Sequence, residues 1–298
     1  MQSQLKKSWN FATHLRNQQN QLQHAKLQPD ARILAIYQHK VWVENLPSAP
    51  QLINCPADFQ PADEQLTFLG LDGQQPYFSF CLSDAQANKL LESHPNSTFT
   101  ELKPIAPLLP AGDAELAALA CFSSHWHQRH QFCGVCASPT TISDSGHQRQ
   151  CSNDECDERY FPSMDPAVIM LVTKGDQCLL GRSSRWPDNM YSTLAGFVEP
   201  GETAEQAVAR EVDEEVGIQV ENVIYQNSQS WLFPYSLMLG FRATASHSQI
   251  NYNPAEIEDA RWFTRQQILA GEVDLPNPAA ISYQLITAWL NEASSSQP

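Results

Sequence analysis

The feature that most constrains the fold of this chain is a sharply punctuated acidic stretch, GFVEPGETAEQAVAREVDEEVGI, at residues 196–218. Thr203 and Gln206 have the spacing of a capping box, and Gly217 suits the left-handed conformation that ends many helices. These signals predict a helix from about residue 204 to residue 216. Its apolar residues recur along one stripe, which should pack on a sheet. The residues of the stripe are Ala204, Ala207, Val208, Val212 and Val216.

Three carboxylates of this stretch, Glu211, Glu214 and Glu215, fall on one face of the predicted helix, because they are spaced at i, i+3 and i+4. Like charges at these spacings repel one another, and they lie near the helix C-terminus, the end that disfavours anions. A divalent cation would offset the repulsion, because Mg²⁺ binds carboxylate oxygens together with waters and substrate phosphates. For an isolated Glu-x-x-Glu-Glu the alternative is a solvated acidic face.

The surroundings of the three carboxylates favour the metal site. The stretch fits, without a gap, the pattern Gly-x₅-Glu-x₇-Arg-Glu-U-x-Glu-Glu-x-Gly-U, where U is a bulky aliphatic residue, and so it resembles the Nudix box. The fixed positions are filled by Gly196, Glu202, Arg210, Glu211, Val212, Glu214, Glu215, Gly217 and Ile218. The resemblance implies that Glu211, Glu214 and Glu215 are catalytic and hold Mg²⁺ or Mn²⁺ against a diphosphate. It also implies structural roles for Gly196, Gly217 and an ion pair between Glu202 and Arg210.

Four of the eight cysteines form a cluster, in which Cys133-x₂-Cys136 is followed after fourteen residues by Cys151-x₄-Cys156. Two such pairs supply the four thiolates of a closed, tetrahedral, structural Zn²⁺ site, which leaves no open position for catalysis. Two disulfides are the alternative, and the absence of an apolar signal-peptide segment argues against them. Nearby histidines are not needed as ligands. These are His125, His127, His130 and His147.

The rest of the chain predicts an α+β architecture in three parts. Over residues 1–125 we expect a β-rich domain with strand pairs at 33–44 and 66–82, then a Pro-rich link and a helix capped by Asp113. The zinc ribbon should occupy residues 126–163. Interleaved strands and helices fill residues 164–298, where the resemblance implies a Nudix α/β/α sandwich. We find no internal repeats and no chemistry in the first part.

Composition limits the functions that this chain can have. The formal net charge is −15, which argues against a tight grip on extended nucleic acid. No apolar run approaches the ~20 residues that span a bilayer, so we expect no membrane association. The first 26 residues contain no acidic residue, which a transit peptide could explain, but a Gln-rich solvated helix is the simpler interpretation. We expect a cytoplasmic protein, with organelle targeting as the alternative.

A second resemblance narrows the substrate. A zinc ribbon directly before a Nudix domain resembles the NADH pyrophosphatase family, and SQSWLFPYSLM at residues 228–238 is similar to that family's Ser-Gln-Pro-Trp-Pro-Phe-Pro-x-Ser signature. Ser230 and Leu232 replace two prolines of the signature, which loosens the loop. The resemblance implies further site residues. They are the Ala195 carbonyl and Glu256 as metal ligands, with Glu258 as the rival of Glu256, and Phe161, Phe197, Gln229 and Trp231 as substrate-binding residues.

The function that these resemblances imply is hydrolysis of the diphosphate of NADH or NAD⁺ to NMN(H) and AMP. They also imply NAD-capped RNA 5′ ends as substrates, and a homodimer in which Phe161 contributes to the partner's site. Two alternatives remain open. The first is a Nudix hydrolase of another nucleoside diphosphate compound, such as ADP-ribose. The second is a zinc-ribbon binding module whose Nudix fold is inactive.

Overall fold

The computed structural model describes residues 9–56, 59, 61–62 and 65–292. The chain divides into two compact units. Unit 1 consists of Met1–Ser163 and Leu232–Pro234, and unit 2 consists of Met164–Trp231 and Tyr235–Pro298. Each unit is described by itself below.

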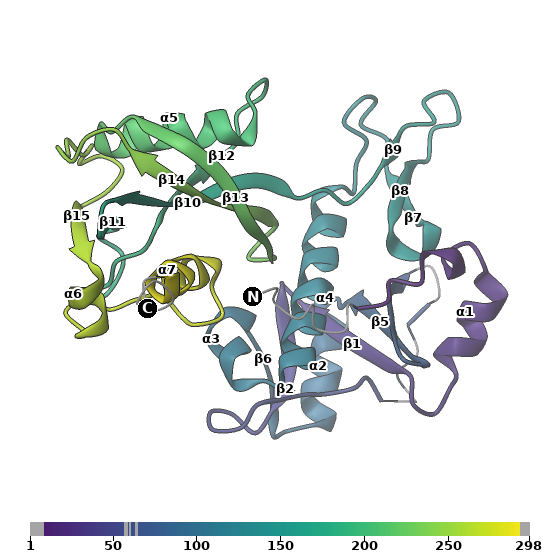
Figure 1. Ribbon diagram of the computed structural model, residues 1–298. Coiled ribbons are helices and arrows are strands. Elements are labelled where there is room, and N and C mark those ends of the chain that lie inside the picture. Colours follow the sequence, from purple (N-terminus) through teal and green to yellow (C-terminus); the bar gives the residue numbers. More distant parts are fainter. Residues whose placement is uncertain (1–8, 57–58, 60, 63–64, 293–298) are drawn as a thin grey trace. The chain divides into compact units, whose positions relative to one another are not determined.

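Unit 1 is built on a mixed sheet with the strand order β3-β2-β1-β5-β4, and β6 pairs with β2. Strands β1, β2, β5 and β6 are labelled in Figure 1. Its helical elements are η1 (Thr13–Leu15), α1 (Gln19–Lys26), α2 (Asp84–Ser93), α3 (Leu102–Ile105), η3 (Ala106–Leu108), α4 (Ala111–Arg129) and η4 (Asp144–Gly146). Its strands are β1 (Arg32–Tyr37), β2 (Lys40–Glu44), β3 (Gln51–Leu52), β4 (Thr67–Asp72), β5 (Gln75–Cys81), β6 (Ser97–Thr100), β7 (Thr140–Ser143), β8 (Gln148–Cys151) and β9 (Arg159–Tyr160). The expected strand pairs at residues 33–44 and 66–82 are confirmed as the hairpins β1–β2 and β4–β5.

The expected start of helix α4 is wrong by three residues, because the N-cap is Pro110 and not Asp113, and the expected link before it is partly helical. The helix begins at Ala111, because the carbonyl of Pro110 accepts its first hydrogen bond, from Ala114 N. Asp113 lies inside the first turn, where its carboxylate accepts a hydrogen bond from Arg32 at 2.7 Å. The Pro-rich stretch before α4 is itself helical in part, over α3 and η3. Of the N-terminal stretch 1–26, α1 covers Gln19–Lys26, and residues 1–8 lie outside the described residues.

The cysteine-rich segment of unit 1 folds as the three-stranded sheet β7-β8-β9. It is fastened to the larger sheet where η4 meets β4. A Cβ on Gly146 would come within 2.6 Å of the Thr67 Cα, so only glycine allows this approach. Beside it, the His147 ring bonds the Phe68 carbonyl at 2.6 Å. The cysteine-rich segment therefore packs against the larger sheet of unit 1 through these contacts.

Unit 2 has a mixed sheet with the order β13-β14-β10-β11-β15, and β12 pairs with β10. Its elements are β10 (Asp165–Lys174), β11 (Gln177–Arg182), β12 (Leu194–Phe197), α5 (Ala204–Val216), β13 (Val220–Trp231), β14 (Ser236–Ala245), β15 (Asp259–Thr264), α6 (Arg265–Leu269) and α7 (Ile281–Glu292). Helices α5 and α7 cover opposite faces of this sheet (Figure 1), each over its own apolar core. The expected α+β fold and α/β/α sandwich are thereby confirmed.

The two sheets repeat one topology, which the sequence did not reveal as a repeat. In unit 1, β1 pairs with β2 antiparallel and with β5 parallel, and β5 pairs with β4 antiparallel. In unit 2, β10, β11, β14 and β13 make the same set of pairings. The difference lies before β4, where the described residues between β2 and β4 contain no counterpart of α5. Over its described residues, unit 1 therefore has the strand pairing of unit 2 without a counterpart of its acidic helix.

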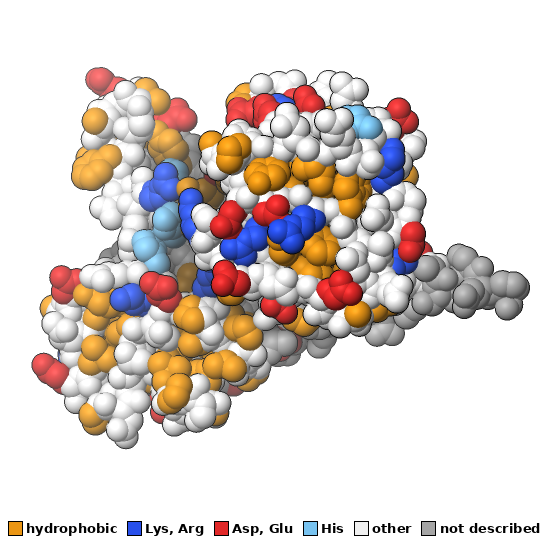
Figure 2. Space-filling model, turned by 90° about the vertical axis from the view of Figure 1, so that its left-hand side faces the viewer, with side chains coloured by type: hydrophobic (Ala, Val, Ile, Leu, Met, Phe, Trp, Pro, Cys, Tyr) orange, Lys and Arg blue, Asp and Glu red, His pale blue; other side chains and the backbone are white. Residues whose placement is uncertain are grey.

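Charges are interspersed on the face of the molecule drawn in Figure 2, where basic side chains lie among acidic ones. Ion pairs within unit 2 show the same mixing. Arg182 pairs with Glu258 at 2.6 Å, and Arg261 pairs with Asp259 at 2.6 Å. None of the described helices combines the length and the apolar character needed to cross a membrane.

Candidate active site and zinc centre

The acidic helix α5 begins and ends where the local sequence signals place it, at Ala204 and Val216. The Thr203 hydroxyl accepts a hydrogen bond from Gln206 N at 3.3 Å, and the Gln206 side chain accepts one from Thr203 N at 2.8 Å. Gly217 has φ 67° and closes the helix with a hydrogen bond to the Asp213 carbonyl. Because both ends are fixed locally, the angular positions of the carboxylates on α5 are fixed as well.

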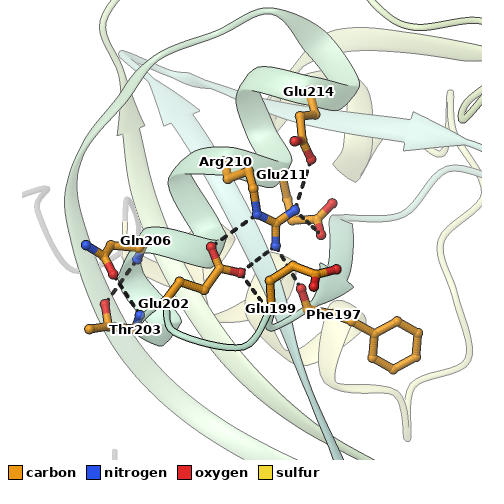
Figure 3. Close-up of polar contacts among 8 residues, drawn as sticks. All are labelled: Phe197, Glu199, Glu202, Thr203, Gln206, Arg210, Glu211 and Glu214. Carbon is orange, nitrogen blue, oxygen red and sulfur yellow. Dashed lines mark hydrogen bonds and ion pairs between the residues drawn. The ribbon is translucent and has the colours of Figure 1, made fainter.

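Arg210 ties α5 to the loop that precedes it (Figure 3). Its guanidinium donates to both oxygens of Glu202, at 2.6 and 3.1 Å, and to the Phe197 carbonyl at 2.9 Å. Glu202 in turn accepts from Glu199 N at 2.7 Å. This bidentate pair is the geometry in which an Arg–carboxylate interaction is strong and directional. It joins the end of β12, the loop and the middle of α5 into one rigid piece.

The same guanidinium also reaches the acidic face, a contact that the sequence did not predict. Arg210 Nη1 donates to Glu211 Oε1 and to Glu214 Oε2, each at 2.9 Å. One cation thus touches three carboxylates, and their negative charge is only partly compensated. Figure 3 shows the carboxylates of Glu211 and Glu214 turned toward Arg210 from successive turns of α5.

Gly196 brings strand β12 against this acidic face. A Cβ at this position would lie 1.9 Å from the Glu211 carboxyl carbon, so any side chain would collide with it. The neighbouring residue Ala195 is exposed, and it pairs with Ile169 of β10. The Glu211 carboxylate therefore lies directly over the backbone of β12, next to Ala195, whose carbonyl was an expected metal ligand.

Glu215 is the most perturbed acid of the site. The pKa of its carboxyl is raised to about 8. Burial is the largest cause, and the negative charges of Glu211 and Glu256 add to it. Among the described residues, no group donates a hydrogen bond to its buried Oε2 atom. A buried carboxylate oxygen without a donor is costly to ionise unless a cation binds it.

Glu256 belongs to the same charge cluster, whereas its rival Glu258 does not. The charge of Glu256 contributes to the raised pKa of both Glu211 and Glu215, so it lies within electrostatic reach of the helix carboxylates. Burial is the main reason that the pKa of Glu211 is raised, and Arg210 opposes the rise. Glu258 instead accepts a hydrogen bond from Arg182 at 2.6 Å. The structure thus brings Glu256 to the cluster, whereas Glu258 pairs with Arg182 and is not among the charges that raise the pKa of Glu211 or Glu215.

This acidic set has the chemistry of a site for a hard divalent cation. Hard cations take carboxylate and carbonyl oxygens, and the donorless Glu215 oxygen and the mutual repulsion of the acids both call for a positive charge. The carboxylate oxygens do not converge as tightly as the thiols of the ribbon. In the described part of the chain, the thiols alone form a set of three or more ligand atoms that all lie within 4.8 Å of one another. Arg210 donates hydrogen bonds to two of these carboxylates, those of Glu211 and Glu214, and so holds them in the positions observed.

The expected substrate-binding residues are divided between the units. Phe197, at the end of β12, and Phe161, in the ribbon, are 57% and 60% exposed, so both rings are available for stacking. Gln229, on β13, is already engaged with the segment before α7. Its amide donates to the Ala279 carbonyl at 2.9 Å and accepts from Ile281 N at 2.8 Å. Trp231 is the last residue of β13, so the signature stretch forms the end of the β13–β14 hairpin.

Four thiols gather in the ribbon. The Sγ atoms of Cys133 and Cys156 lie 3.7 Å apart, and those of Cys136 and Cys151 lie 3.4 Å apart. All eight cysteines are free, which contradicts the disulfide alternative. Backbone amides already point at two of the sulfurs, because Val135 N donates to Cys133 and Asn153 N donates to Cys151. The set fits a closed tetrahedral Zn²⁺ site.

The nearby histidines hold unit 1 together. His127 is buried between Thr67 and Arg149, and burial followed by the charge of Arg149 lowers its pKa to about 3. The His147 ring bonds the Phe68 carbonyl, and the His130 ring bonds the Trp126 carbonyl. None of these rings belongs to the metal-ligating set of the described residues, as expected.

Comparison with known proteins assigns a family to each part of the chain. The family model of the NUDIX domain matches residues 164–290, and that of the NADH pyrophosphatase zinc ribbon domain matches residues 128–161. Residues 30–126 match the NADH pyrophosphatase-like rudimentary NUDIX domain, which agrees with the repeated topology of the two sheets.

Similar proteins carry names from one group of enzymes. NAD-capped RNA hydrolase NudC of Chromobacterium violaceum is 42% identical over 185 residues, which are 62% of this chain and 68% of that protein. NudC of Pseudomonas putida is 46% identical over 186 residues, 61% of this chain and 65% of that protein. Human NAD-capped RNA hydrolase NUDT12 is 39% identical over 236 residues, 74% of this chain and 51% of that protein. The chain thus spans about half the length of its human relative.

Proposed function

The chain belongs to the NADH pyrophosphatase group of the Nudix hydrolases, and from this premise we propose that it hydrolyses the diphosphate of NADH or NAD⁺. The products would be NMN(H) and AMP, and the reaction would require Mg²⁺ or Mn²⁺. The observation that carries the proposal is Glu215, a carboxylate with a pKa of about 8 and a buried oxygen that lacks a donor among the described residues. It lies on the helix of a complete Nudix box.

Each acidic residue has a role in this proposal. Glu211, Glu214, Glu215 and Glu256 would hold the divalent cation together with the Ala195 carbonyl. When bound, the cation would neutralise phosphoryl oxygens and lower the pKa of a water molecule at the site. Glu215 would also accept a proton from the attacking water, because its buried Oε2 atom receives no hydrogen bond from the described residues. Glu202 and Arg210, with Gly196 and Gly217, would hold the helix in place.

The remaining site residues would bind the two nucleotide halves of the substrate. Phe197 is exposed beside the metal-ligand helix and would stack on one ring. Trp231 and Gln229 would shape the pocket from the end of the β13–β14 hairpin. Phe161 would stack on a ring in the site of a second copy within a homodimer. Its exposure in the ribbon supports this role.

The dimer can be tested by complementation, because Phe161 and Glu215 would then act on one site from different copies. Phe161→Ala and Glu215→Gln chains are each expected to be impaired when alone. Mixed after exchange of copies, they should recover about a quarter of wild-type activity, because half of the dimers carry one intact site. No recovery in mixtures shown by mass to contain heterodimers would contradict the shared site.

NAD-capped RNA 5′ ends are a second proposed substrate, supported by the names of the similar proteins. Cleavage at the same diphosphate would release NMN and leave a 5′-monophosphate on the RNA. The net charge of −15 and the interspersed charges in Figure 2 favour recognition of the cap over a grip on the RNA body.

A substrate panel tests the proposal. Initial rates with NADH, NAD⁺, NAD-capped RNA and ADP-ribose should be compared at matched Mg²⁺ or Mn²⁺ concentrations. We expect kcat/KM for an NAD-containing substrate to exceed that for ADP-ribose. A wide preference for ADP-ribose would favour the alternative Nudix hydrolase. Equal, negligible rates for wild type and Glu215→Gln on every substrate would favour the inactive module.

We also propose a division into residues 1–125, 126–163 and 164–298, which the boundaries of the three matching family models support. For location we propose the cytoplasm, where eight free cysteines and a thiolate zinc site would persist. Organelle targeting is the alternative, and one similar plant protein is named chloroplastic. Imaging of the tagged full chain distinguishes the two.

A further inference from the structure

Tyr160 reaches from strand β9 into the zinc centre. Its hydroxyl oxygen lies 3.2 Å from the Cys133 Sγ atom and accepts a hydrogen bond from Gly134 N at 2.8 Å. In the zinc-bound state Cys133 is a thiolate and can only accept, so the hydroxyl must be the donor between these two atoms. The accepting side of the hydroxyl is used by Gly134, which leaves its proton for the sulfur.

The contact between Tyr160 and Cys133 differs from the hydrogen bonds that backbone amides donate to Cys133 and Cys151, because it joins two distant segments. The amides of Val135 and Asn153 each donate to a cysteine two positions earlier, at 3.4 Å, and belong to the cysteine's own turn. Tyr160 lies 27 residues after Cys133 and comes from another strand. It therefore joins the first cysteine turn to β9, whereas the amides only stabilise each turn internally.

We propose that Tyr160 is a positioning residue that retains the ribbon zinc through its hydrogen bond to Cys133 and thereby fixes the place of the neighbouring Phe161. The part that concerns Phe161 rests on the proposed function. The part that concerns zinc does not depend on it.

The backbone of β9 supplies the second half of this link. Tyr160 pairs with Arg149 of β8, and Arg149 is itself buried, with its guanidinium bonded to the side chain and carbonyl of Thr140. Tyr160 is thus held by its backbone on one side and by the zinc thiolate through its hydroxyl on the other. Phe161 follows it directly and is 60% exposed, so the structure beneath it, and not packing of its own ring, sets where it lies.

A hydrogen bond to a metal-bound thiolate stabilises it by compensating part of its charge and fixing its orientation. Cys133 is only 3% exposed, so water cannot easily take the place of the phenol. Loss of the hydroxyl should therefore weaken the hold on zinc, whereas the ring, which stays in Tyr160→Phe, keeps its packing beside His130.

Zinc release is the first test and needs no substrate. Zinc-loaded full-length wild type, Tyr160→Phe and Tyr37→Phe would be mixed with a chromogenic chelator under native conditions. Tyr37→Phe is the matched control, because it removes a phenol that bonds exposed Asp84 in the same unit. We expect release about 10–100-fold faster for Tyr160→Phe and unchanged for the control. Equal rates for all three proteins would overturn the proposal.

Cobalt substitution provides a readout that global destabilisation alone would not shift. With Co²⁺ in the ribbon, the sulfur-to-metal charge-transfer band reports the charge on the thiolates. This band should move in Tyr160→Phe and stay in place in Tyr37→Phe. An unchanged band with fully bound cobalt would contradict a hydrogen bond to Cys133.

A double-mutant cycle tests the link to Phe161. If Tyr160 acts on substrate binding through Phe161, Tyr160→Phe alone should raise KM for NADH with little change in kcat. In a chain that already carries Phe161→Ala, it should cause no further rise in KM. Additive effects on KM would overturn this link. Absence of NADH hydrolysis by the wild type would refute the proposed function instead, and the zinc arms would still decide the role of Tyr160.

Discussion

The raised pKa of Glu215 makes a quantitative prediction about the stability of the protein without its divalent cation. The perturbation is Glu215→Gln, which keeps the shape of the side chain and removes its ionisation. In the native state the pKa of this carboxyl is raised from 4.5 to about 8, first by burial and then by Glu211 and Glu256. The whole shift would correspond to an upper bound of about 5 kcal/mol, and relaxation with water penetration should leave on the order of 2–3 kcal/mol.

The sign follows from proton binding. Between about pH 4.5 and pH 8 the native protein keeps a proton that the unfolded chain has released, so the contribution of Glu215 to stability falls as pH rises. Below this window the carboxyl is protonated in both states and costs nothing. Above it the ionised carboxylate is buried at full cost, and the glutamine variant avoids that cost.

Urea unfolding is the assay, with zinc retained in the ribbon and without added Mg²⁺ or Mn²⁺. Relative to wild type, Glu215→Gln should gain on the order of 2–3 kcal/mol at about pH 9 and almost nothing near pH 4.5. Saturating Mg²⁺ should shrink the gain, because it stabilises the wild type by binding its folded state. Glu221→Gln, on exposed β13, is the control and should show neither effect. A gain that is equal at both pH values, or a loss at high pH, would refute the reasoning.

Three further perturbations follow from the structure. Gly196→Ala places a Cβ against the Glu211 carboxyl, so kcat for NADH should fall by about 10²-fold or more, at a stability cost of about 1–3 kcal/mol in unfolding experiments. His127, with its pKa lowered to about 3, is neutral when folded and protonated when unfolded between that value and 6.5. Wild-type stability should therefore fall on acidification through this window, and His127→Gln should flatten the fall by on the order of 2 kcal/mol at about pH 4. Thr203→Ala removes a helix cap and should cost about 1 kcal/mol in thermal or urea unfolding, while kcat changes little.

Local signals explain why the core of the site could be predicted from the sequence. Helix α5 carries its own capping residues and its own closing glycine, so its bounds and the shared face of its three carboxylates needed no tertiary information. The four cysteines lie in two close pairs, and any fold that brings the pairs together places four thiolates around one metal ion.

The features that were missed depend on contacts between distant segments. Asp113 looked like a helix cap, but Arg32, 81 positions away, takes its carboxylate. Arg210 contacts Glu211 and Glu214 because its guanidinium lies between helix α5 and the loop that carries Glu202. That position depends on how the loop folds against the helix. Helix α2 was overlooked although Ser83 and Gln86 form a capping box of the same kind as that of α5, so there the signal was present in the sequence.

The repeat of the sheet topology had no sequence signal of its own. Strands tolerate any residue of suitable size and polarity on a buried face, so two sheets can share their pairing without sharing residues. The segment before β4 also has no described counterpart of α5, which is the part of unit 2 with the most distinctive sequence. The relation is visible only when the pairing of β1 with β5 and of β10 with β14 is known.

The central claim is that the carboxylates of α5 hold a divalent cation for cleavage of a dinucleotide diphosphate. Chromatographic measurement of NMN(H) and AMP formed from NAD(H) tests it most directly, with wild type and Glu215→Gln each assayed with and without Mg²⁺ or Mn²⁺. The account predicts equimolar products from wild type with the cation, and rates lower by orders of magnitude without it or in the variant. Equal product formation in all four reactions would contradict the account.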